Sequence, residues 1–495
     1  MPPLAELFDV AAARRIDAQA SARLGDGGAS LMSQAAQAAW QCLLQRWPQA
    51  RRVCVVVGPG NNGGDGYVLA GLARAAGRQV QLLRLASDVP TTPLARAALQ
   101  AWLDGGGQVD SFTGTLPPAD VLVDALYGIG LNRAPGGDAA ALIEAINASP
   151  VPVLSLDVPS GVDADRGAVP GVAVRAWVTL QFIVRHRGLY TGAALEHVGR
   201  RQLAPLQLPP GAATGVLSSA QSWRPARLAA QLPARRLNTH KGESGHVLCV
   251  GGNLGSGGAV MLASEAALRA GAGLVSVATQ AVHVAPLLAR LPEAMVHAVV
   301  DAQDLQVLLT RAKVIAIGPG LGQDDWAREL WRQVLGGGKP LVIDADALNL
   351  LASAPQLLHE AILTPHPGEA ARLLGCSSAQ IQADRYASAQ ALADRFHAVV
   401  VLKGAGSVVA APGRLPRVIE AGNPGMAVGG MGDLLTGIIA ALRAQGLDAF
   451  DAASSGALLH GLAGDAAASD GQRGLLPTDL LVPLRRLVNP ESSTA

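Results

Sequence analysis

The feature that most constrains the fold of this chain is a repeated unit, in which a short uncharged run enters a glycine-rich turn and then a helical pattern. Residues 53–57 (V-C-V-V-V) show no polar alternation, which is typical of a strand buried on both faces of a parallel sheet. The turn G-P-G-N-N-G-G-D-G follows at residues 58–66, and apolar residues recur at helical spacing from 67 to 76. This order predicts a doubly wound α/β fold, whose ligands bind at the carboxyl ends of the strands.

The same unit returns in the second half of the chain. Residues 247–250 lead into G-G-N-L-G-S-G-G-A at 251–259 and then into a helical pattern. A second complete unit predicts a second α/β domain, with a parallel sheet and its functional turns at one edge. We expect a helix after each of four more apolar runs that end in polar or glycine turns, at residues 313–317, 341–343, 362–364 and 399–402.

The length and one change in composition divide the chain. At 495 residues the chain is too long for one ordinary core. Residues 203–235 are rich in Ala, Pro and Leu and hold no extended period, which places the domain boundary near residue 215. We therefore expect two doubly wound α/β domains, at residues 1–215 and 216–495.

Charge and composition exclude several classes of protein. The 39 lysines and arginines nearly balance the 38 acidic residues, so no long-range field attracts nucleic acid or an anionic membrane. No signal-peptide pattern opens the chain, and no run of about 18 uncharged apolar residues predicts a membrane span. The four cysteines lie far apart, as buried thiols of a reducing compartment do. We expect a soluble, cytoplasmic protein that acts on small molecules, and the sequence leaves a homo-oligomer open.

Polar groups mark the ends of three predicted strands in the first half. Asn61 and Asn62 follow the first strand, Asp124 ends a second, and Asp157 with Ser160 ends a third. Because these ends meet at one edge of a parallel sheet, they suggest a shared pocket. Oxygen ligands of low total charge suit a hard cation such as potassium. The alternative is a tight turn that uses Asn and Gly for their tolerance of left-handed conformations.

In the second half the turn before residues 434–442 is the strongest candidate site. It reads Gly429-Gly430-Met431-Gly432, and a glycine turn at a helix start offers unpaired N–H groups to phosphate. Asp433 lies at the same start, where it either caps the helix or takes a proton from a group that attacks the phosphate. His366 stands between two prolines, so it is either an aimed side chain or part of a rigid turn.

The motifs of the first half resemble those of the NAD(P)H-hydrate epimerase domain over roughly residues 1–210. They are G-x-G-N-N-G-G-D-G, D-A-L-Y-G-I-G-L-N-R and D-V-P-S-G. The resemblance implies that Asn62, Asp124 and Ser160 bind K⁺. It also implies interconversion of the R and S hydroxyl configurations at C6 of a hydrated nicotinamide ring, for which a carboxylate assists proton transfer, and we favour Asp157. Implied substrate contacts are Asn61, Asn62, Gly63, Gly64, Asp65, Gly128, Ile129, Gly130, Leu131, Asn132, Arg133, Ala134 and Asp157.

The second half, over about residues 235–490, resembles the ADP-dependent NAD(P)H-hydrate dehydratase, a ribokinase-like family. K-G-x-x-G-H, G-P-G-L-G, D-A-D-A-L-N, T-P-H-P-G-E, K-G-A-G-S and N-P-G-M-A-V-G-G-M-G-D occur in that family's order, and the turn G-S-G-G-A is slightly more polar than expected. The resemblance implies that Ala259, Gly322, His366 and Asp433 face the hydrated nucleotide. It implies nucleotide binding by Lys403, Gly404, Ala405, Gly406, Ser407 and Gly432.

The two resemblances together imply repair of the hydrates NADHX and NADPHX. Asp433 would take the proton of the C6 hydroxyl, which attacks the terminal phosphate of ADP while Mg²⁺ bridges the phosphates. Elimination of the phosphate ester then gives NAD(P)H, AMP and phosphate. One alternative is a ribokinase-like small-molecule kinase fused to a nucleotide-binding regulatory domain, and another is a non-catalytic nucleotide-binding regulator.

Overall fold

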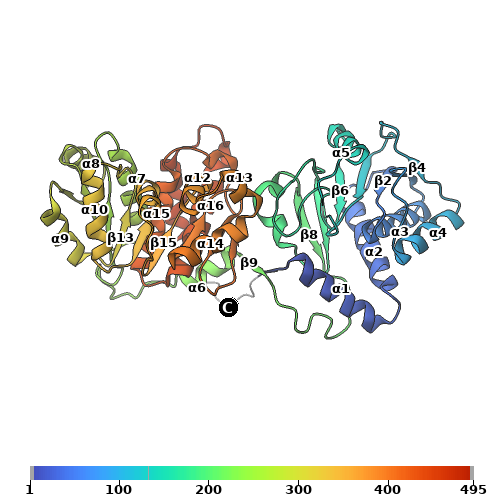
Figure 1. Cartoon of the computed structure of the whole chain (residues 1–495), viewed down its shortest axis with the longest axis horizontal. Coiled ribbons are helices and arrows are strands. Elements are labelled where there is room, and N and C mark those ends of the chain that lie inside the picture. Colours follow the sequence, from blue (N-terminus) through green and yellow to red (C-terminus); the bar gives the residue numbers. More distant parts are fainter. Residues whose placement is uncertain (1–4, 132, 491–495) are drawn as a thin grey trace. The chain divides into compact units, whose positions relative to one another are not determined.

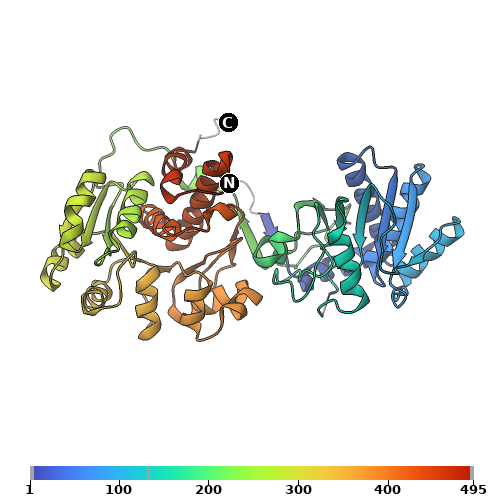
Figure 2. The ribbon, with the colours of Figure 1, turned by 90° about the horizontal axis from the view of Figure 1, so that it is seen from above.

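The computed structural model describes residues 5–131 and 133–490 (Figure 1). The chain divides into two compact units: residues 6–220 form the first, and residues 221–490 form the second together with Ala5. Helices flank the sheet of each unit (Figure 1, Figure 2). Among the described residues no helix is both long enough and apolar enough to cross a membrane.

The first unit is built on a seven-stranded sheet with parallel pairing throughout. Chain order reverses between β2 and β5, because β3 and β4 extend the sheet on one side of β2 and β5 to β8 on the other. Such a reversal is where doubly wound folds place their ligand crevice. The strand order is β4 (Asp110–Ser111), β3 (Gln79–Arg84), β2 (Arg52–Val57), β5 (Val121–Ala125), β6 (Val153–Leu156), β7 (Val178–Phe182) and β8 (Arg200–Ala204).

Strand β2 is buried on both faces, as its unalternating sequence predicts. Val53, Val55 and Val57 pack into one core cluster with residues of α2 (Ala29–Arg46), α3 (Asn61–Ala75) and α4 (Pro93–Asp104). Cys54 and Val56 pack on the opposite face, against α5 (Asp138–Ala148). Helix α1 (Val10–Leu24) precedes these elements.

The second unit carries the longer sheet, whose strands β10 to β16 pair in parallel. Its order is β1 (Ala5–Leu7), β9 (Ala220–Trp223), β18 (Arg417–Ile419), β17 (Ser407–Ala410), β16 (Val399–Leu402), β15 (Ala361–Leu363), β14 (Leu341–Ile343), β13 (Val314–Ile317), β10 (His246–Val250), β11 (Leu274–Thr279) and β12 (Met295–Ala298).

One expected helix of this unit is a strand instead. We predicted a helix after the turn at residues 403–407, and that prediction is wrong, because β17 pairs antiparallel to β16 and β18 antiparallel to β17. The run Val408-Val409-Ala410 is short and β-branched, and Pro412-Gly413 ends it, which favours a strand over a helix. The turn therefore closes a hairpin at the end of the parallel sheet.

Helices α7 (Gly257–Arg269), α15 (Met431–Ala444) and α16 (Ala449–Ala467) share the large core cluster with this sheet. Helix α15 lies very close to α7, since a Cβ on Gly437 would lie 2.0 Å from the carbonyl oxygen of Ala263. The remaining α-helices are α6 (Leu228–Gln231), α8 (Val284–Arg290), α9 (Ala302–Arg311), α10 (Asp325–Gly336), α11 (Ala345–Ser353), α12 (Pro367–Leu374), α13 (Ser378–Ala383), α14 (Arg385–Phe396) and α17 (Leu481–Leu487).

Candidate active sites

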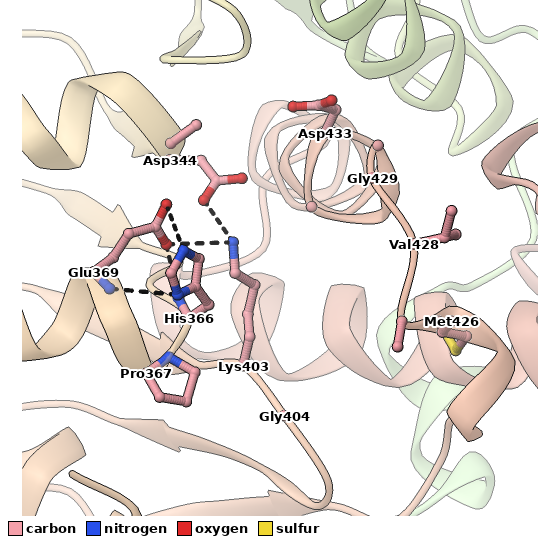
Figure 3. Close-up of a pocket in the computed structure, with 14 residues that line it drawn as sticks. Asp344, His366, Pro367, Glu369, Lys403, Gly404, Met426, Val428, Gly429 and Asp433 are labelled. Carbon is pink, nitrogen blue, oxygen red and sulfur yellow. Dashed lines mark hydrogen bonds and ion pairs between the residues drawn. The ribbon is translucent and has the colours of Figure 1, made fainter. Parts of the chain in front are cut away.

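A cavity of about 540 Å³ opens at the carboxyl ends of the parallel strands of the second unit. Segments that follow β14, β15 and β16 form one side of it, and the loop before α15 with the first turn of that helix forms the other. Figure 3 shows the side chains that line it, which are Asp344, Ala345, His366, Pro367, Glu369, Lys403, Gly404, Met426, Ala427, Val428, Gly429, Gly430, Gly432 and Asp433.

Asp433 lines this cavity and does not cap its helix. Gly430 is the N-cap of α15, with φ +93° and no side-chain cap, so Asp433 is the third helical residue. The capping alternative is therefore wrong. Burial is the main cause that raises the pKa of Asp433 to about 7, with Asp344 and Asp346 raising it further and Lys403 opposing them. A carboxyl group that ionises near neutral pH is suited to act as a general base.

Lys403, which is mostly covered, forms an ion pair with the buried Asp344 beside Asp433. Nζ of Lys403 lies 2.7 Å from Oδ1 of Asp344 (Figure 3). The hydroxyl of Thr436 donates to Oδ2 at 2.9 Å. Burial alone would lower the pKa of Lys403, but Asp344 and Glu369 outweigh it and raise that pKa. Burial alone would likewise raise the pKa of Asp344, yet Lys403 and Thr436 hold it below its usual range. Lys403 therefore brings a fixed positive charge to the cavity wall.

His366 both stabilises the turn in which it stands and presents its ring to the cavity. Its Nδ1 accepts hydrogen bonds from the backbone N–H groups of Gly368 at 2.9 Å and Glu369 at 3.4 Å, so it caps α12. The ring is nevertheless half exposed and lines the cavity. Burial and the charges of Lys403 and Arg372 lower its pKa. A neutral ring that accepts at Nδ1 carries its hydrogen on Nε2.

Other residues expected at this site lie at its margin or outside the lining. From residues 403–407 the lining includes Lys403 and Gly404, and the hydroxyl of Ser407 donates to the carbonyl of Gly404 at 3.0 Å. Ala405 and Gly406 belong to the same hairpin turn. Ala259 and Gly322 are not among the lining residues. The N–H of Gly322 donates to Asp346 at 2.8 Å, and Ala259 lies in the first turn of α7.

Two carboxylates of the cavity were missed as site residues. Asp344 follows β14 in the motif D-A-D-A-L-N, and Glu369 is the third helical residue after His366 in T-P-H-P-G-E. Both positions carried a usable signal, since strand ends and capping boxes place polar side chains at predictable points.

In the first unit, the N-N-G-G-D run proves to be the first turn of α3, which begins at Asn61, and not a loop before it. The N-cap, Gly60, makes no side-chain cap, so the first N–H groups of the helix are available to an anion. None of the five glycines from Gly58 to Gly66 has a positive φ, so the left-handed turn alternative is wrong. They allow close packing instead: a Cβ on Gly63 would lie 2.0 Å from the carbonyl oxygen of Gly58.

Asp124 and Ser160 meet at the reversal of strand order. Asp124 is buried within β5, and its oxygens accept from the hydroxyl of Ser160 at 2.6 Å, its N–H at 2.9 Å and the hydroxyl of Ser155 at 2.8 Å. Burial raises the pKa of Asp124 in spite of these bonds. The amide oxygen and nitrogen of Asn62 are also buried and have no hydrogen-bond partner among the described residues.

Asp157 lies against the loop that begins at Gly128. Its Oδ2 accepts weakly from the N–H of Ile129 at 3.4 Å and would lie 3.0 Å from a Cβ on Gly128. Its Oδ1 lies 2.7 Å from Nε2 of His186, a residue that the sequence did not single out. No motif surrounds His186, so nothing local could have found it.

The remaining predicted contacts of this unit lie in the first turns of α3 and in that loop. The pKa of Asp65 is raised well above its ordinary value by burial and then by Asp157 and Asp17. The side-chain oxygen of Asn61 accepts from Thr92 at 2.6 Å. Gly64 packs in α3, where an added Cβ would lie 2.4 Å from the methyl of Met32. Gly130, Leu131, Arg133 and Ala134 follow Ile129 in the loop before α5, and Asn132 lies outside the described residues.

Two family models match the two units. The model described as NAD(P)H-hydrate dehydratase matches residues 247–486, and that described as YjeF-related protein N-terminus matches residues 28–188. Among solved structures, a hypothetical protein of Streptococcus mutans is 33% identical, with a TM-score of 0.51 over 54% of this chain and 98% of that one. A ribokinase-like superfamily protein of Enterococcus faecalis is also 33% identical, with a TM-score of 0.50 over 54% and 95%.

Whole-length relatives carry both units in one chain. The bifunctional NAD(P)H-hydrate repair enzyme of Escherichia coli is 46% identical over 97% of this chain and 93% of its own length. The enzyme of the same description from Coxiella burnetii is 45% identical over 93% and 95%. With such identity over nearly all of its length, the chain belongs to the family of bifunctional NAD(P)H-hydrate repair enzymes.

Proposed function

We propose that this protein repairs hydrated NADH and NADPH with both of its units. The first unit interconverts the R and S forms at C6, and the second dehydrates the S form with ADP, giving NAD(P)H, AMP and phosphate. The observation that carries this function is Asp433, a carboxyl group with a pKa of about 7 on a cavity wall that also holds the Lys403–Asp344 pair.

The dehydration begins with a proton transfer to Asp433. Asp433 takes the proton of the C6 hydroxyl, and the oxygen attacks the terminal phosphorus of ADP, which releases AMP. The ring nitrogen then donates its lone pair as the C6–O bond breaks and phosphate leaves. Loss of a proton from C5 forms the C5–C6 double bond and returns the lone pair to nitrogen.

Lys403 and the start of α15 supply the positive field for this transfer. Lys403 is held charged beside the cavity, and Gly432 leaves open space near its ammonium group, since an added Cβ would lie 3.2 Å from Nζ. The unpaired backbone N–H groups that follow Gly430 can donate hydrogen bonds to phosphate oxygens. Together they favour the charge that develops on the transferred group.

The described residues of this cavity offer Mg²⁺ no ready set of protein ligands. Among the described residues, no group of three or more His, Cys, Asp or Glu side chains could hold a metal ion. Both oxygens of Asp344 are engaged by Lys403 and Thr436, and one oxygen of Glu369 accepts from the N–H of His366 at 2.8 Å. Mg²⁺ would therefore depend mainly on phosphate oxygens, and bound there it would offset their charge.

In the first unit, Asp157 is the proposed base for epimerisation. Its Oδ2 takes the proton of the C6 hydroxyl, the O–H electron pair becomes the second bond of a C6 carbonyl, and the C6–N1 bond breaks with its pair remaining on N1. Rotation about C5–C6 presents the other face of the carbonyl to N1. Ring closure re-forms C6–N1, and the oxygen takes the proton back from Asp157.

Asn62, Asp124 and Ser160 fit a potassium site next to this base. The buried amide of Asn62, which has no hydrogen-bond partner in the part of the chain that the structure describes, offers an oxygen ligand. The buried carboxyl of Asp124 offers negative charge. Tyr127 joins these groups to the Gly128 loop, because its N–H donates to the hydroxyl of Ser160 at 2.8 Å. Bound K⁺ would neutralise Asp124 and fix the loop that contacts the substrate.

The test is to incubate the full chain with ADP and NADH hydrate of mixed C6 configuration. Complete conversion to NADH with one AMP for each NADH is the expected result. Conversion that stops at the S fraction would refute the epimerase assignment. A stable phosphorylated product without NADH would instead identify a small-molecule kinase, and binding without turnover would identify a regulator.

A further inference from the structure

His186 is buried against Asp157 and has no part in the chemistry described so far. Its side chain is 2% exposed, and Nε2 lies 2.7 Å from Oδ1 of Asp157. Its backbone N–H donates to the side chain of Gln181 at 2.8 Å, and the next N–H, of Arg187, donates to the carbonyl of Phe8 at 2.9 Å. The imidazole is therefore held in place by its backbone as well as by the carboxylate.

The two oxygens of Asp157 face different partners. Oδ1 is engaged by His186, whereas Oδ2 faces Gly128 and Ile129, the start of the loop to which substrate contacts are assigned. The N–H of Ile129 is 3.4 Å from Oδ2, a weak contact that leaves this oxygen able to accept another proton. The bond to His186 thus decides which oxygen is left for the substrate.

The backbone of Asp157 itself is strained. Its φ is +64°, a left-handed conformation that a residue with a Cβ adopts at a cost. The N–H of Asp157 donates to the carbonyl of Leu180 at 2.8 Å, which helps to hold it there. The fixed backbone and the contact at Oδ1 together hold Oδ2 of Asp157 in one direction.

The other carboxyl groups nearby supply no countercharge to Asp157. Asp17 on α1 and Asp65 on α3 both have raised pKa values, first because of burial and then because of the charge of Asp157. The side-chain partner that the structure gives Oδ1 of Asp157, among the described residues, is Nε2 of His186.

We propose that His186 is a positioning residue of the epimerase site, which holds Asp157 through Oδ1 so that Oδ2 meets the C6 hydroxyl of the hydrate. The inference rests on the proposed function, in which Asp157 is the base. His186 itself transfers no proton: its Nε2 hydrogen bond persists while Oδ2 takes the hydroxyl proton and returns it.

The test compares His186→Ala with His186→Gln in the full chain, using purified R-form NADH hydrate and excess ADP. The slow formation of NADH then reports epimerisation, once the rate of spontaneous conversion of the R to the S form, measured without protein from the change in their ratio, is subtracted. Dehydration of the S form by the same molecules is the internal control, since it depends on the other unit. Glutamine carries an N–H at a similar distance from Cα and can replace the hydrogen bond to Oδ1.

The alanine variant is expected to lose about 10²-fold in epimerase kcat with little change in KM, because a base displaced by about 1 Å costs that much. The glutamine variant should recover most of the loss. Epimerisation by His186→Ala within threefold of wild type, in a protein whose Asp157→Asn variant is inactive, would overturn the inference. So would a folded glutamine variant as defective as the alanine one.

Failure of the underlying function gives a different result. If Asp157→Asn epimerises at the wild-type rate, Asp157 is not the base and the role of His186 falls with it. If His186→Ala also loses dehydration, or unfolds at a lower temperature than wild type, then His186→Gln decides whether His186 positions Asp157. The inference then requires that His186→Gln epimerises at a rate within about tenfold of wild type.

Discussion

Nζ of Lys403 lies 2.7 Å from Oδ1 of Asp344, and the two charges act on Asp433 in opposite directions. Burial is the larger cause and raises the pKa of Asp433 to about 7, Asp344 raises it further, and Lys403 lowers it. Thr436, on the same helix as Asp433, fixes the second oxygen of Asp344. The ionisation of the proposed base is therefore set mainly by burial and adjusted by an ion pair whose members follow β14 and β16, on either side of β15.

Replacing Asp433 by Asn should remove dehydration and preserve the fold. The loss of a general base costs about 10²–10⁴-fold in rate. Because ionisation of Asp433 is disfavoured in the folded protein, its neutral form stabilises the fold at low pH, and this contribution is lost as pH rises through about 7. The variant should thus be at least as stable as wild type at pH 8, by chemical unfolding. Near-normal dehydration by this variant would contradict the mechanism.

The pH dependence of dehydration should follow the same group. A base acts in its ionised form, so kcat/KM should fall as pH drops below about 7, the pKa of Asp433 in the free protein. Initial rates of NADH formation between pH 5 and 9 check this, with the hydrate and ADP shown to be stable at each pH. A profile that stays flat down to pH 5 would exclude Asp433 as the titrating base.

Replacing Lys403 by Met should destabilise the second unit, because Asp344 would remain buried without its countercharge. A buried pair broken in this way costs about 3 kcal/mol. The pair lowers the pKa of Asp344, so its stabilisation is present at neutral pH and fades as pH falls below the ordinary range of a carboxyl group. The difference in unfolding free energy between variant and wild type should shrink accordingly.

Lys313→Met is the matched control for that experiment, since Lys313 is exposed where β13 begins, at the opposite edge of the sheet. It should change the unfolding free energy by no more than about 0.5 kcal/mol. In Lys403→Met the pKa of Asp433 should also rise, because Lys403 opposes that rise. An unchanged pH profile of dehydration in a folded Lys403→Met protein would show that Lys403 does not influence the pKa of Asp433.

Much of the second site could be predicted because glycine and proline turns mark its residues in the sequence. Asp433, His366 and Lys403 each stand next to glycine or proline turns, and the structure places all three on one cavity. The pairing of Lys403 with Asp344 spans 59 residues and depends on the order of the strands, which local patterns do not contain. The strand β17 was missed because the repeat of strand, turn and helix was extended over it, although Val408 and Val409 favour a strand.

The first site shows a further limit. Asn62, Asp124 and Ser160 could be found at strand ends, but His186 meets Asp157 only because β6 and β7 are neighbours, and no motif surrounds it. The sequence showed the glycines of the N-N-G-G-D run, but it did not show why glycine is needed at these positions. Their small size matters for contacts with Gly58 and Ala125, and a contact of that kind has no signature in sequence.

Potassium should affect one activity and not the other. Replacing K⁺ by tetramethylammonium, or Asp124 by Ala, should slow epimerisation at least tenfold, because the Gly128 loop loses its anchor next to Asp157. Dehydration of the S form should be unaffected by the Asp124→Ala change. Asp120→Ala is the control, since Asp120 is a partly exposed ion-pair partner of Arg52 just before the same strand. Epimerisation indifferent to both K⁺ and Asp124 would refute the proposed site.

Two glycines of α3 separate packing from helix propensity. A Cβ on Gly63 would lie 2.0 Å from the carbonyl oxygen of Gly58, whereas one on Gly71 would meet no atom within 4 Å. Gly63→Ala should therefore destabilise the first unit by about 3 kcal/mol and displace Asn62, with loss of epimerisation. Gly71→Ala should instead stabilise it by up to about 1 kcal/mol, because alanine is the better helix former. Thermal unfolding with the epimerisation rate measures both, and equal effects of the two substitutions would show that α3 does not depend on this contact.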